Sequence, residues 1–166
     1  LDPDTNMGSL VSLAHREKFE GYIALAREEG GTIVCGGGRP GLPAPFDHGA
    51  FLQPTVITGL SASSRCSTEE IFGPVVTVHA FDTEDEAVQM ANGVRYGLAG
   101  SVWTQDLSRA HRVAQAIESG MVWVNCWLVR DLRVPFGGMK HSGVGREGGR
   151  WSFDFYSELR NICVRL

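Results

Sequence analysis

The chain has 166 residues, of which 43% are hydrophobic and 20% are charged, a composition that excludes collagen-like and low-complexity proteins. Its 15 Lys and Arg and 19 Asp and Glu give a formal net charge of −4, which argues against a basic surface for nucleic acid. No apolar run approaches the ~20 residues of a membrane span, and no export signal is visible. The sequence therefore predicts a globular, cytoplasmic domain that binds neither nucleic acid nor membrane.

The cysteines are widely spaced and form no metal-binding or redox motif. There are four of them, at Cys35, Cys66, Cys126 and Cys163, with no C-x-x-C pair and no histidine at metal-ligand spacing. Free thiols are favoured over two disulfides because nothing indicates export. Cys126 is the one candidate nucleophile, but nothing in the sequence would activate it, so a packed thiol is favoured. We therefore predict no catalytic residue and no metal site in this chain.

The predicted elements alternate between helices and strands along most of the chain. Apolar periodicity and glycine stops define the helices, and Thr83 with Glu86 forms a capping box before one of them. In chain order the elements are a helix at 10–29, a strand at 32–35, an extended segment at 51–57, a loop at 58–69, a strand at 75–81, a helix at 84–91, a strand at 98–104, a helix capped by Asp106 that ends at Gly120, and a strand at 121–125. This alternation predicts an α/β fold in which a mainly parallel sheet is flanked by helices.

The chain beyond residue 125 has a different character. Residues 126–149 form a long glycine-rich segment without periodicity, and such long loops in compact domains are usually functional or disordered. A helix at 147–156 follows. A final strand at 162–166, in which apolar residues alternate with others, is the last predicted element.

Residues 143–148 match the dinucleotide-binding pattern G-x-G-x-x-G through Gly143, Gly145 and Gly148. That pattern holds a phosphate where it follows a strand, opens a helix and leads to a second strand with an acidic residue. Here the preceding segment is loop. A tight glycine turn is therefore favoured over a phosphate cradle.

Two short groups of residues are candidate binding elements. Glu69, Glu70 and Phe72 precede a Gly-Pro turn at the mouth of the strand at 75–81. A carboxylate there can accept hydrogen bonds from the paired hydroxyls of a ribose, and the ring offers a face to a nicotinamide or a sugar. A plain acidic turn is the alternative.

The second group is Arg130, Asp131 and Arg133 in the long loop. Arginine presents a planar fork that suits carboxylates. Two interpretations stay open: an arginine contacts a substrate, or an arginine pairs with Asp131 and only shapes the loop.

Four segments in series resemble the NAD(P)-dependent aldehyde dehydrogenase superfamily. They read EEIFGPV at 69–75, YGLAGSVWT at 96–104, SGMVWVN at 119–125 and PFGGMKHSGVGREGG at 135–149. They follow one another in the family's order and spacing, and the likeness extends through the whole chain. Within the superfamily, NCWLVRDLR at 125–133 is most similar to the dehydrogenases of 2-aminomuconate and 2-hydroxymuconate semialdehydes.

The resemblance covers the C-terminal third of such an enzyme. It implies that residues 1–157 belong to the catalytic domain and that residues 158–166 form an oligomerisation strand of a homo-oligomer. The family's nucleotide-binding domain, general-base glutamate and catalytic cysteine precede this region. The expected function is the C-terminal part of an NAD-dependent enzyme that oxidises a carboxylate-bearing semialdehyde to the acid. The alternative is a non-catalytic fragment that acts only as a folding or oligomerisation module.

The resemblance also implies cofactor contacts. Glu70 matches the glutamate that binds the nicotinamide-side ribose of NAD, and Phe72 matches the aromatic residue beside it. His15 and Lys18 fall where the family's first helix of this region approaches the adenosine ribose, a less specific match. The three glycines of the 143–148 turn are structural in this comparison.

The loop at 125–133 corresponds to the lining of the aldehyde tunnel. Its candidate substrate-binding residues are Arg130, Arg133 and Asn125. Many relatives have an aromatic residue at the position of Arg130, so the arginine implies an acidic substrate. Burying a guanidinium there without an anion is costly, and we expect the substrate's carboxylate to be that anion.

Overall fold

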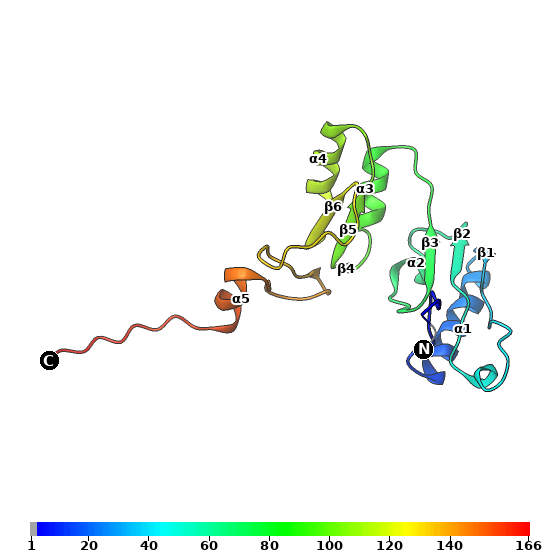
Figure 1. Cartoon of the computed structure of the whole chain (residues 1–166). Helices are drawn as coiled ribbons and strands as arrows, with labels where there is room; N and C mark the ends of the chain where they lie inside the picture. The colour runs from blue at the N-terminus through cyan, green and yellow to red at the C-terminus, as the bar shows by residue number, and fades with distance from the viewer. Residues whose placement is uncertain (1–2) are drawn as a thin grey trace. The chain divides into compact units, whose positions relative to one another are not determined.

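The structure is a computed structural model that describes residues 3–166, and the chain divides into two compact units (Figure 1). Unit 1 is Leu1–Phe81 and unit 2 is Asp82–Leu166. Both units combine helices with short strands, and the predicted α/β class is confirmed. No helix of the described residues is long and apolar enough to cross a membrane.

Unit 1 packs one long helix against a three-stranded sheet (Figure 1). Its elements are α1 (Leu13–Glu28), β1 (Thr32–Cys35), the 3-10 helix η1 (Phe46–His48), β2 (Thr55–Thr58), α2 (Arg65–Thr68) and β3 (Val75–Val78). The strand order is β1-β2-β3, with β1 antiparallel to β2 and β2 parallel to β3. The apolar residues of α1 recur at helical spacing and meet the sheet in one core, whose buried members are Phe19, Ile23, Ala26, Leu52, Ile57, Leu60, Cys66 and Ile71.

Two sequence predictions in unit 1 need correction. Helix α1 begins at Leu13 and not at residue 10, because Ser12 is its N-cap and accepts a hydrogen bond from the His15 N–H. The prediction of a continuous loop at 58–69 is wrong, since α2 lies within it. This helix has only four residues, and the Glu29 carboxylate that receives its first N–H groups is 36 positions from Arg65. No local pattern could have revealed that partner.

Unit 2 is built from two strand pairs and three helices among its described residues. Its elements are α3 (Glu84–Asn92), β4 (Tyr96–Gly97), β5 (Ala99–Val102), α4 (Leu107–Ala116), β6 (Met121–Val124), β7 (Met139–Lys140) and α5 (Gly149–Tyr156). Strands β5 and β6 are parallel and are joined through α4, which is the predicted crossover. Strands β4 and β7 are antiparallel.

The strand predicted at 98–104 is the shorter strand β5, and the separate strand β4 before it pairs with a different partner. The predicted loop at 126–149 contains β7 and a bridge between Phe136 and Glu147, so it is more ordered than its sequence indicates. The capping box of α3 is present in a modified form. Thr83 accepts from the Glu86 N–H, while the Glu86 carboxylate accepts from the N–H of Asp82.

The predicted glycine turn is confirmed. Gly145 has φ +70, and a Cβ there would lie 2.1 Å from the Phe155 ring. Gly148 has φ +97, and its Cβ would lie 2.3 Å from the carbonyl oxygen of Val134. These positions accept glycine because of backbone conformation and close packing, which are structural reasons.

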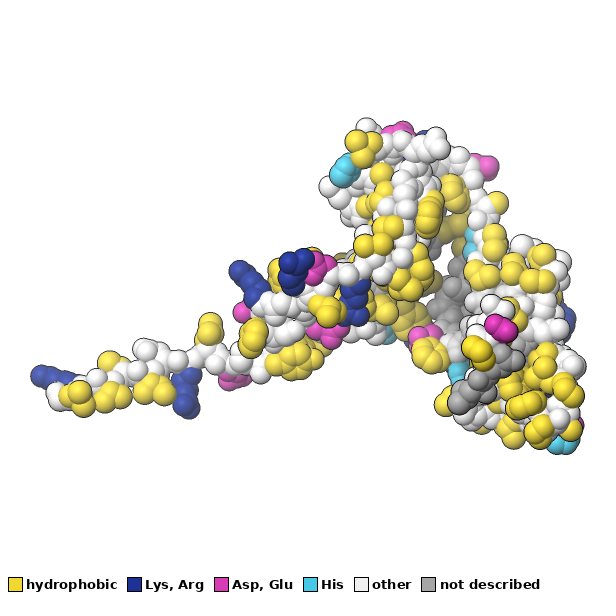
Figure 2. Space-filling view, in the orientation of Figure 1, with side chains coloured by type: hydrophobic (Ala, Val, Ile, Leu, Met, Phe, Trp, Pro, Cys, Tyr) yellow, Lys and Arg dark blue, Asp and Glu magenta, His cyan; other side chains and the backbone are white. Residues whose placement is uncertain are grey.

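Residues 157–166 carry no helix or strand. A strand needs a hydrogen-bonding neighbour, and no described residue of the chain is paired with this segment. Its hydrophobic side chains are exposed, as Figure 2 shows along the C-terminal segment; they are Leu159, Ile162, Val164 and Leu166. The oligomerisation strand at 158–166 stays a prediction.

Candidate functional site

The four predicted cofactor residues lie together in unit 1. His15 and Lys18 are three positions apart in α1 and therefore share one helix face. The His15 ring stacks on Phe72 with ring centroids 6.2 Å apart and an interplanar angle of 26°. The Lys18 ammonium donates a hydrogen bond to the backbone carbonyl of Glu70 over 3.1 Å. Residues 57 positions apart in sequence thus meet at one end of α1.

The side chains of Glu70 and Phe72 are available to a ligand. Among the described residues the Glu70 carboxylate has no hydrogen bond or ion pair, and it is exposed. The Phe72 side chain is 73% exposed, although it is a large apolar group. Its backbone is left-handed at φ +57, a conformation that a non-glycine residue adopts where its surroundings hold it.

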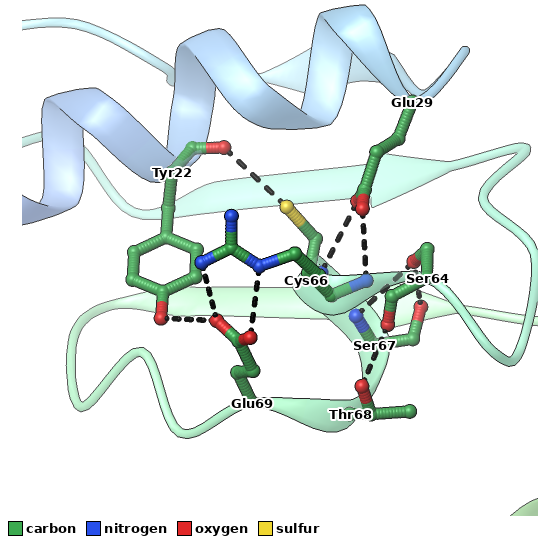
Figure 3. A network of polar contacts seen from close by, with 8 residues as sticks. Tyr22, Glu29, Ser64, Cys66, Ser67, Thr68 and Glu69 are labelled. Carbon is green, nitrogen blue, oxygen red and sulfur yellow. Dashed lines mark hydrogen bonds and ion pairs between the residues drawn. The ribbon is translucent and has the colours of Figure 1, made fainter.

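Glu69 has a different environment from its neighbour. Its carboxylate accepts a hydrogen bond of 2.8 Å from the Tyr22 hydroxyl and a two-pronged interaction from Arg65, at 2.8 and 3.0 Å (Figure 3). The hydrogen bond to Glu69 raises the pKa of Tyr22 because it stabilises the neutral phenol. The two adjacent acidic residues therefore differ: the Glu69 carboxylate has partners within the protein, whereas the Glu70 carboxylate has none among the described residues.

The neighbouring thiol, Cys66, is not a nucleophile. Burial, reinforced by the adjacent Glu29 carboxylate, raises the pKa of the Cys66 thiol to about 12. Its Sγ donates to the carbonyl of Tyr22 at 3.5 Å (Figure 3). A reactive cysteine needs a lowered pKa, so this thiol belongs to the core. All four cysteines are free thiols.

In unit 2, Arg130 already has an anionic partner. Its Nη2 lies 2.8 Å from Glu147 Oε1, and its guanidinium carbon lies 4.3 Å from the centre of the Phe136 ring. Arg130 therefore does not lack an anion within the protein, as the sequence analysis assumed, because Glu147 supplies one; its contact with a substrate carboxylate stays a prediction. About 41% of the Arg130 side chain remains exposed, so donors stay accessible.

The ambiguity about Asp131 is settled in favour of Arg133. Arg133 Nε lies 2.9 Å from Asp131 Oδ1, and its Nη2 lies 2.5 Å from Oδ2. The hydrogen bond from this side chain lowers the pKa of Asp131. The pair joins residues two positions apart and shapes the loop locally, which was the second of the two interpretations.

Both the oxygen and the nitrogen of the Asn125 side-chain amide form hydrogen bonds with the backbone of Thr104. Its Oδ1 accepts from the Thr104 N–H at 2.9 Å, and its Nδ2 donates to the Thr104 carbonyl at 2.8 Å. The residue has φ +52, which asparagine tolerates better than most residues. The structure therefore gives Asn125 a role in fixing the start of the loop.

A cavity of about 260 Å³ in unit 2 lies beside the glycine turn. Its lining includes Phe136, Arg146, Glu147 and Phe155 but none of the three predicted substrate residues. Glu147 thus lines this cavity and pairs with Arg130, a role that its position within the G-x-G-x-x-G pattern concealed.

Comparison with known proteins gives a consistent result over the whole chain. A model of the aldehyde dehydrogenase family matches residues 1–162. The chain is 55% identical to the 2-hydroxymuconic semialdehyde dehydrogenase of Pseudomonas sp. (strain CF600), over 99% of this chain and 34% of that protein. It is 52% identical to the 2-aminomuconic semialdehyde dehydrogenase of Mus musculus, again over 99% of this chain and 34% of the relative.

Solved structures agree with the sequence matches. The crystal structure of betaine aldehyde dehydrogenase from Staphylococcus aureus in complex with NAD+ superposes with a TM-score of 0.88 at 47% identity, covering 94% of this chain and 31% of that one. The chain belongs to the aldehyde dehydrogenase family, a family of oxidoreductases. The relatives that it matches include semialdehyde dehydrogenases of the kind that its loop at 125–133 resembles. The chain spans about a third of the length of these relatives.

Proposed function

We propose that this chain supplies cofactor and substrate contacts of an NAD-dependent aldehyde dehydrogenase that oxidises a carboxylate-bearing semialdehyde. This proposal is supported chiefly by the exposed carboxylate of Glu70, which lies near the exposed ring of Phe72 in the same turn. His15 and Lys18 of α1 contact this turn. In a family whose members oxidise aldehydes, such a turn is suited to a nucleotide cofactor. Free thiols are compatible with the reducing cytoplasm in which we place the protein.

The residues of unit 1 fit NAD by their chemistry. A ribose presents two adjacent hydroxyls, and an ionised carboxylate such as Glu70 can accept a hydrogen bond from each. Phe72 would cover the adjoining face of the nicotinamide-side ribose, and His15 and Lys18 would approach the adenosine end. The Staphylococcus aureus relative is described in complex with NAD+. NAD, when bound, supplies the acceptor for the hydride that leaves the aldehyde carbon.

The substrate contact that we propose is Arg130. A semialdehyde of a dicarboxylic acid keeps one carboxylate, and the relatives from Pseudomonas sp. and Mus musculus are named for muconic semialdehydes. Glu147 and Phe136 orient the planar guanidinium of Arg130, and its exposed donors can receive a second carboxylate. Arg133 and Asn125 would act beside it by shaping the loop.

We also propose that the segment at 158–166 pairs with another subunit. Its side chains alternate in polarity, its apolar members are exposed, and an unpaired strand edge is stabilised by a partner strand. This is the surface on which a homo-oligomer would form.

The cofactor assignment is tested in a hybrid enzyme. Residues 1–166 replace the matching segment of the Pseudomonas 2-hydroxymuconic semialdehyde dehydrogenase, and Glu70→Gln is compared with Glu28→Gln. Glu28 is an exposed acid of α1. Because hydrogen bonds to charged groups are worth about 1.5–3 kcal/mol, Glu70→Gln should weaken NAD binding or slow hydride transfer by about 10–150-fold. Equal NAD affinity and equal pre-steady-state NADH formation in both variants would refute the assignment.

The substrate assignment is tested in the same hybrid with Arg130→Ala. We expect kcat/KM for an acidic semialdehyde to fall about 10–200-fold, while a neutral aldehyde of similar length changes much less. Glu147→Gln is the informative companion variant, since it frees the guanidinium without removing it. An equal loss with both substrates would mean that Arg130 shapes the loop.

A further inference from the structure

The turn that carries Glu70 is anchored to α1 by the side chain of the preceding residue, Glu69. Glu69 has extended backbone, with φ −94 and ψ 150. Successive side chains of an extended segment point to opposite sides. Holding the Glu69 side chain against α1 therefore directs Glu70 away from α1, where it is exposed.

The contacts of Glu69 form a clamp between two helices (Figure 3). Tyr22 comes from α1 and Arg65 from α2, and both bind the Glu69 carboxylate at 2.8 Å. Arg65 is itself fixed, because its backbone N–H donates to the Glu29 carboxylate at 2.8 Å. We call Tyr22, Arg65 and Glu69 the Glu69 clamp.

The rest of the turn is fixed at its other end. The Thr55 N–H donates to the Pro74 carbonyl at 2.8 Å, which ties the turn to β2. A Cβ on Gly73 would lie 3.0 Å from the Phe19 ring, so the turn lies directly on the core. Phe72, whose backbone is left-handed, lies between Glu69 and this fixed Gly73–Pro74 end of the turn. The Glu69 clamp is the side-chain anchor on the N-terminal side of this segment.

We propose that Glu69 is a positioning residue, which, through Tyr22 and Arg65, fixes the direction in which Glu70 and Phe72 face the cofactor. The proposal rests on the proposed function, in which Glu70 binds the ribose. Glu69 does not contact the cofactor in this scheme, because the protein's own donors occupy its carboxylate. Two adjacent acidic residues thus have separate tasks.

The first test uses the chain itself. Backbone amide hydrogen exchange of residues 70–73 is compared in Glu69→Gln and Glu20→Gln. Glu20 is the matched control, since it also pairs with an arginine, Arg39, in two hydrogen bonds, and its other ion pair is with Arg16 of α1 rather than with the turn. We expect exchange at 70–73 to accelerate about tenfold in Glu69→Gln alone, with the amides of β2 and β3 unchanged. The pKa of Tyr22 should return toward its ordinary value in the same variant, followed by ultraviolet titration.

If Glu69→Gln unfolds unit 1, Tyr22→Phe tests the same clamp with a smaller change. It removes one hydrogen bond and keeps the ring and the Arg65 ion pair. We then expect about threefold faster exchange at 70–73. Unchanged exchange at these residues in a folded variant would overturn the proposal.

The second test asks whether Glu69 acts through Glu70. In the hybrid enzyme, Glu69→Gln should slow hydride transfer about tenfold alone and have little further effect when Glu70→Gln is already present. A general loss of stability would instead give the same factor in both backgrounds and would overturn the positioning role. If Glu70→Gln reduces hydride transfer but Glu69→Gln does not, the positioning role alone falls. If Glu70→Gln has no effect, the cofactor assignment fails and the positioning role fails with it.

Discussion

The two units hold their candidate sites in different ways. In unit 1 the site is fixed by contacts between residues far apart in sequence, such as Tyr22 with Glu69 and Lys18 with Glu70, separated by 47 and 52 positions. In unit 2 the loop at 125–133 is fixed by contacts of shorter range, from Arg133 with Asp131, two positions apart, to Asn125 with Thr104, 21 positions apart. The turn at 69–74 therefore depends on contacts that span most of its unit, whereas the loop at 125–133 depends on contacts between residues closer in sequence.

The burial of hydrophobic side chains also differs between the two units. Among the described residues, only Ala110 and Trp123 of the buried hydrophobic residues belong to unit 2. Unit 2 exposes several large apolar side chains, which include Trp103, Leu107, Trp127 and Leu132. Unit 1 encloses a continuous core beneath α1. Apolar burial is the main source of folding free energy, so unit 1 should be the more stable of the two.

The largest effect should come from opening the core of unit 1. Phe19 is fully buried, and Phe19→Ala should lower the free energy of unfolding of unit 1 by about 3–5 kcal/mol. The control, Trp103→Ala in unit 2, removes a side chain that is 66% exposed and should cost about 0.5 kcal/mol or less. Urea unfolding followed by amide exchange resolves the two units. Similar losses for both variants would contradict the comparison.

The enclosed core of unit 1 should also protect the Cys66 thiol from chemical labelling. Thiolate is the reactive form of cysteine, and raising the pKa of Cys66 from 9.0 to about 12 lowers its thiolate fraction by about 10³ near pH 8. Cys35 and Cys163 are exposed and serve as internal controls. We expect a thiol reagent followed by mass spectrometry to label both of them rapidly and Cys66 only on unfolding. Rapid labelling of Cys66 in the folded chain would show that the core of unit 1 opens readily.

The same thiol chemistry predicts that this chain alone does not oxidise aldehydes. Nucleophilic catalysis needs an activated thiolate with a base close by. Burial and then the neighbouring Glu29 carboxylate raise the pKa of the Cys66 thiol instead of lowering it. We expect no NADH formation above the blank with a reactive aldehyde. Turnover that disappears in Cys126→Ala would contradict this expectation and identify Cys126 as a nucleophile.

The difference between the units also explains what the sequence could reveal. Helix ends at Thr83 and Asp106, and the crossover between β5 and β6, follow from local signals and were predicted. The prediction that His15, Lys18, Glu70 and Phe72 bind the cofactor came from the family resemblance. Residue patterns could not have predicted it, because no periodicity connects α1 to the turn at 69–74. Helix α2 was not predicted because it has only four residues, and beside its local N-cap, Ser64, two of its N–H groups depend on the distant Glu29 carboxylate.

The partner of Arg130 could not be predicted for a related reason. Glu147 lies 17 positions from Arg130. It stands within a glycine pattern that predicts a backbone turn and no side-chain partner. The bridge between Phe136 and Glu147 and the hydrogen bond from the Gly149 N–H to the Leu132 carbonyl bring these two parts of the loop together. Asp131 was the acid nearest to Arg130 in sequence, yet it pairs with Arg133.

The contacts that fix the start of the loop at 125–133 can be tested at Asn125. Asn125→Ala removes two hydrogen bonds to Thr104 and places alanine at φ +52. We expect a loss of about 2 kcal/mol from unit 2, because each neutral hydrogen bond is worth about 0.5–1.5 kcal/mol and the left-handed backbone adds about 1. Asn125→Gly, which removes the bonds but relieves the backbone, should lose less. Equal losses in urea unfolding would assign the whole effect to the hydrogen bonds.

The smallest expected effect concerns the hydrogen bonds by which Glu29 supplements the N-cap of α2, Ser64. Glu29 accepts hydrogen bonds from the N–H groups of Arg65 and Cys66, at 2.8 and 3.2 Å, so Glu29→Gln should destabilise unit 1 by about 1 kcal/mol. Desolvation opposes ionisation of Glu29, but these hydrogen bonds outweigh it and lower the pKa of the carboxyl below its ordinary 4.5. A group whose pKa is lower in the folded state stabilises the fold above its unfolded pKa and loses that contribution as the pH falls through the folded value.

The wild-type chain and Glu29→Gln should therefore differ most at neutral pH and converge as the solution is acidified below about pH 4.5. The matched variant in unit 2 is Asp106→Asn, which removes the charge at the N-cap of α4, where a hydrogen bond from the Arg109 N–H lowers the pKa of Asp106. Because that cap is made within one helical turn, Asp106→Asn should affect amide exchange in α4 alone. Glu29→Gln should instead affect both α2 and the turn at 69–74, since α2 carries the Arg65 of the Glu69 clamp. Exchange confined to α2 in Glu29→Gln would show that the turn is independent of its helix and would weaken the distinction between the two units.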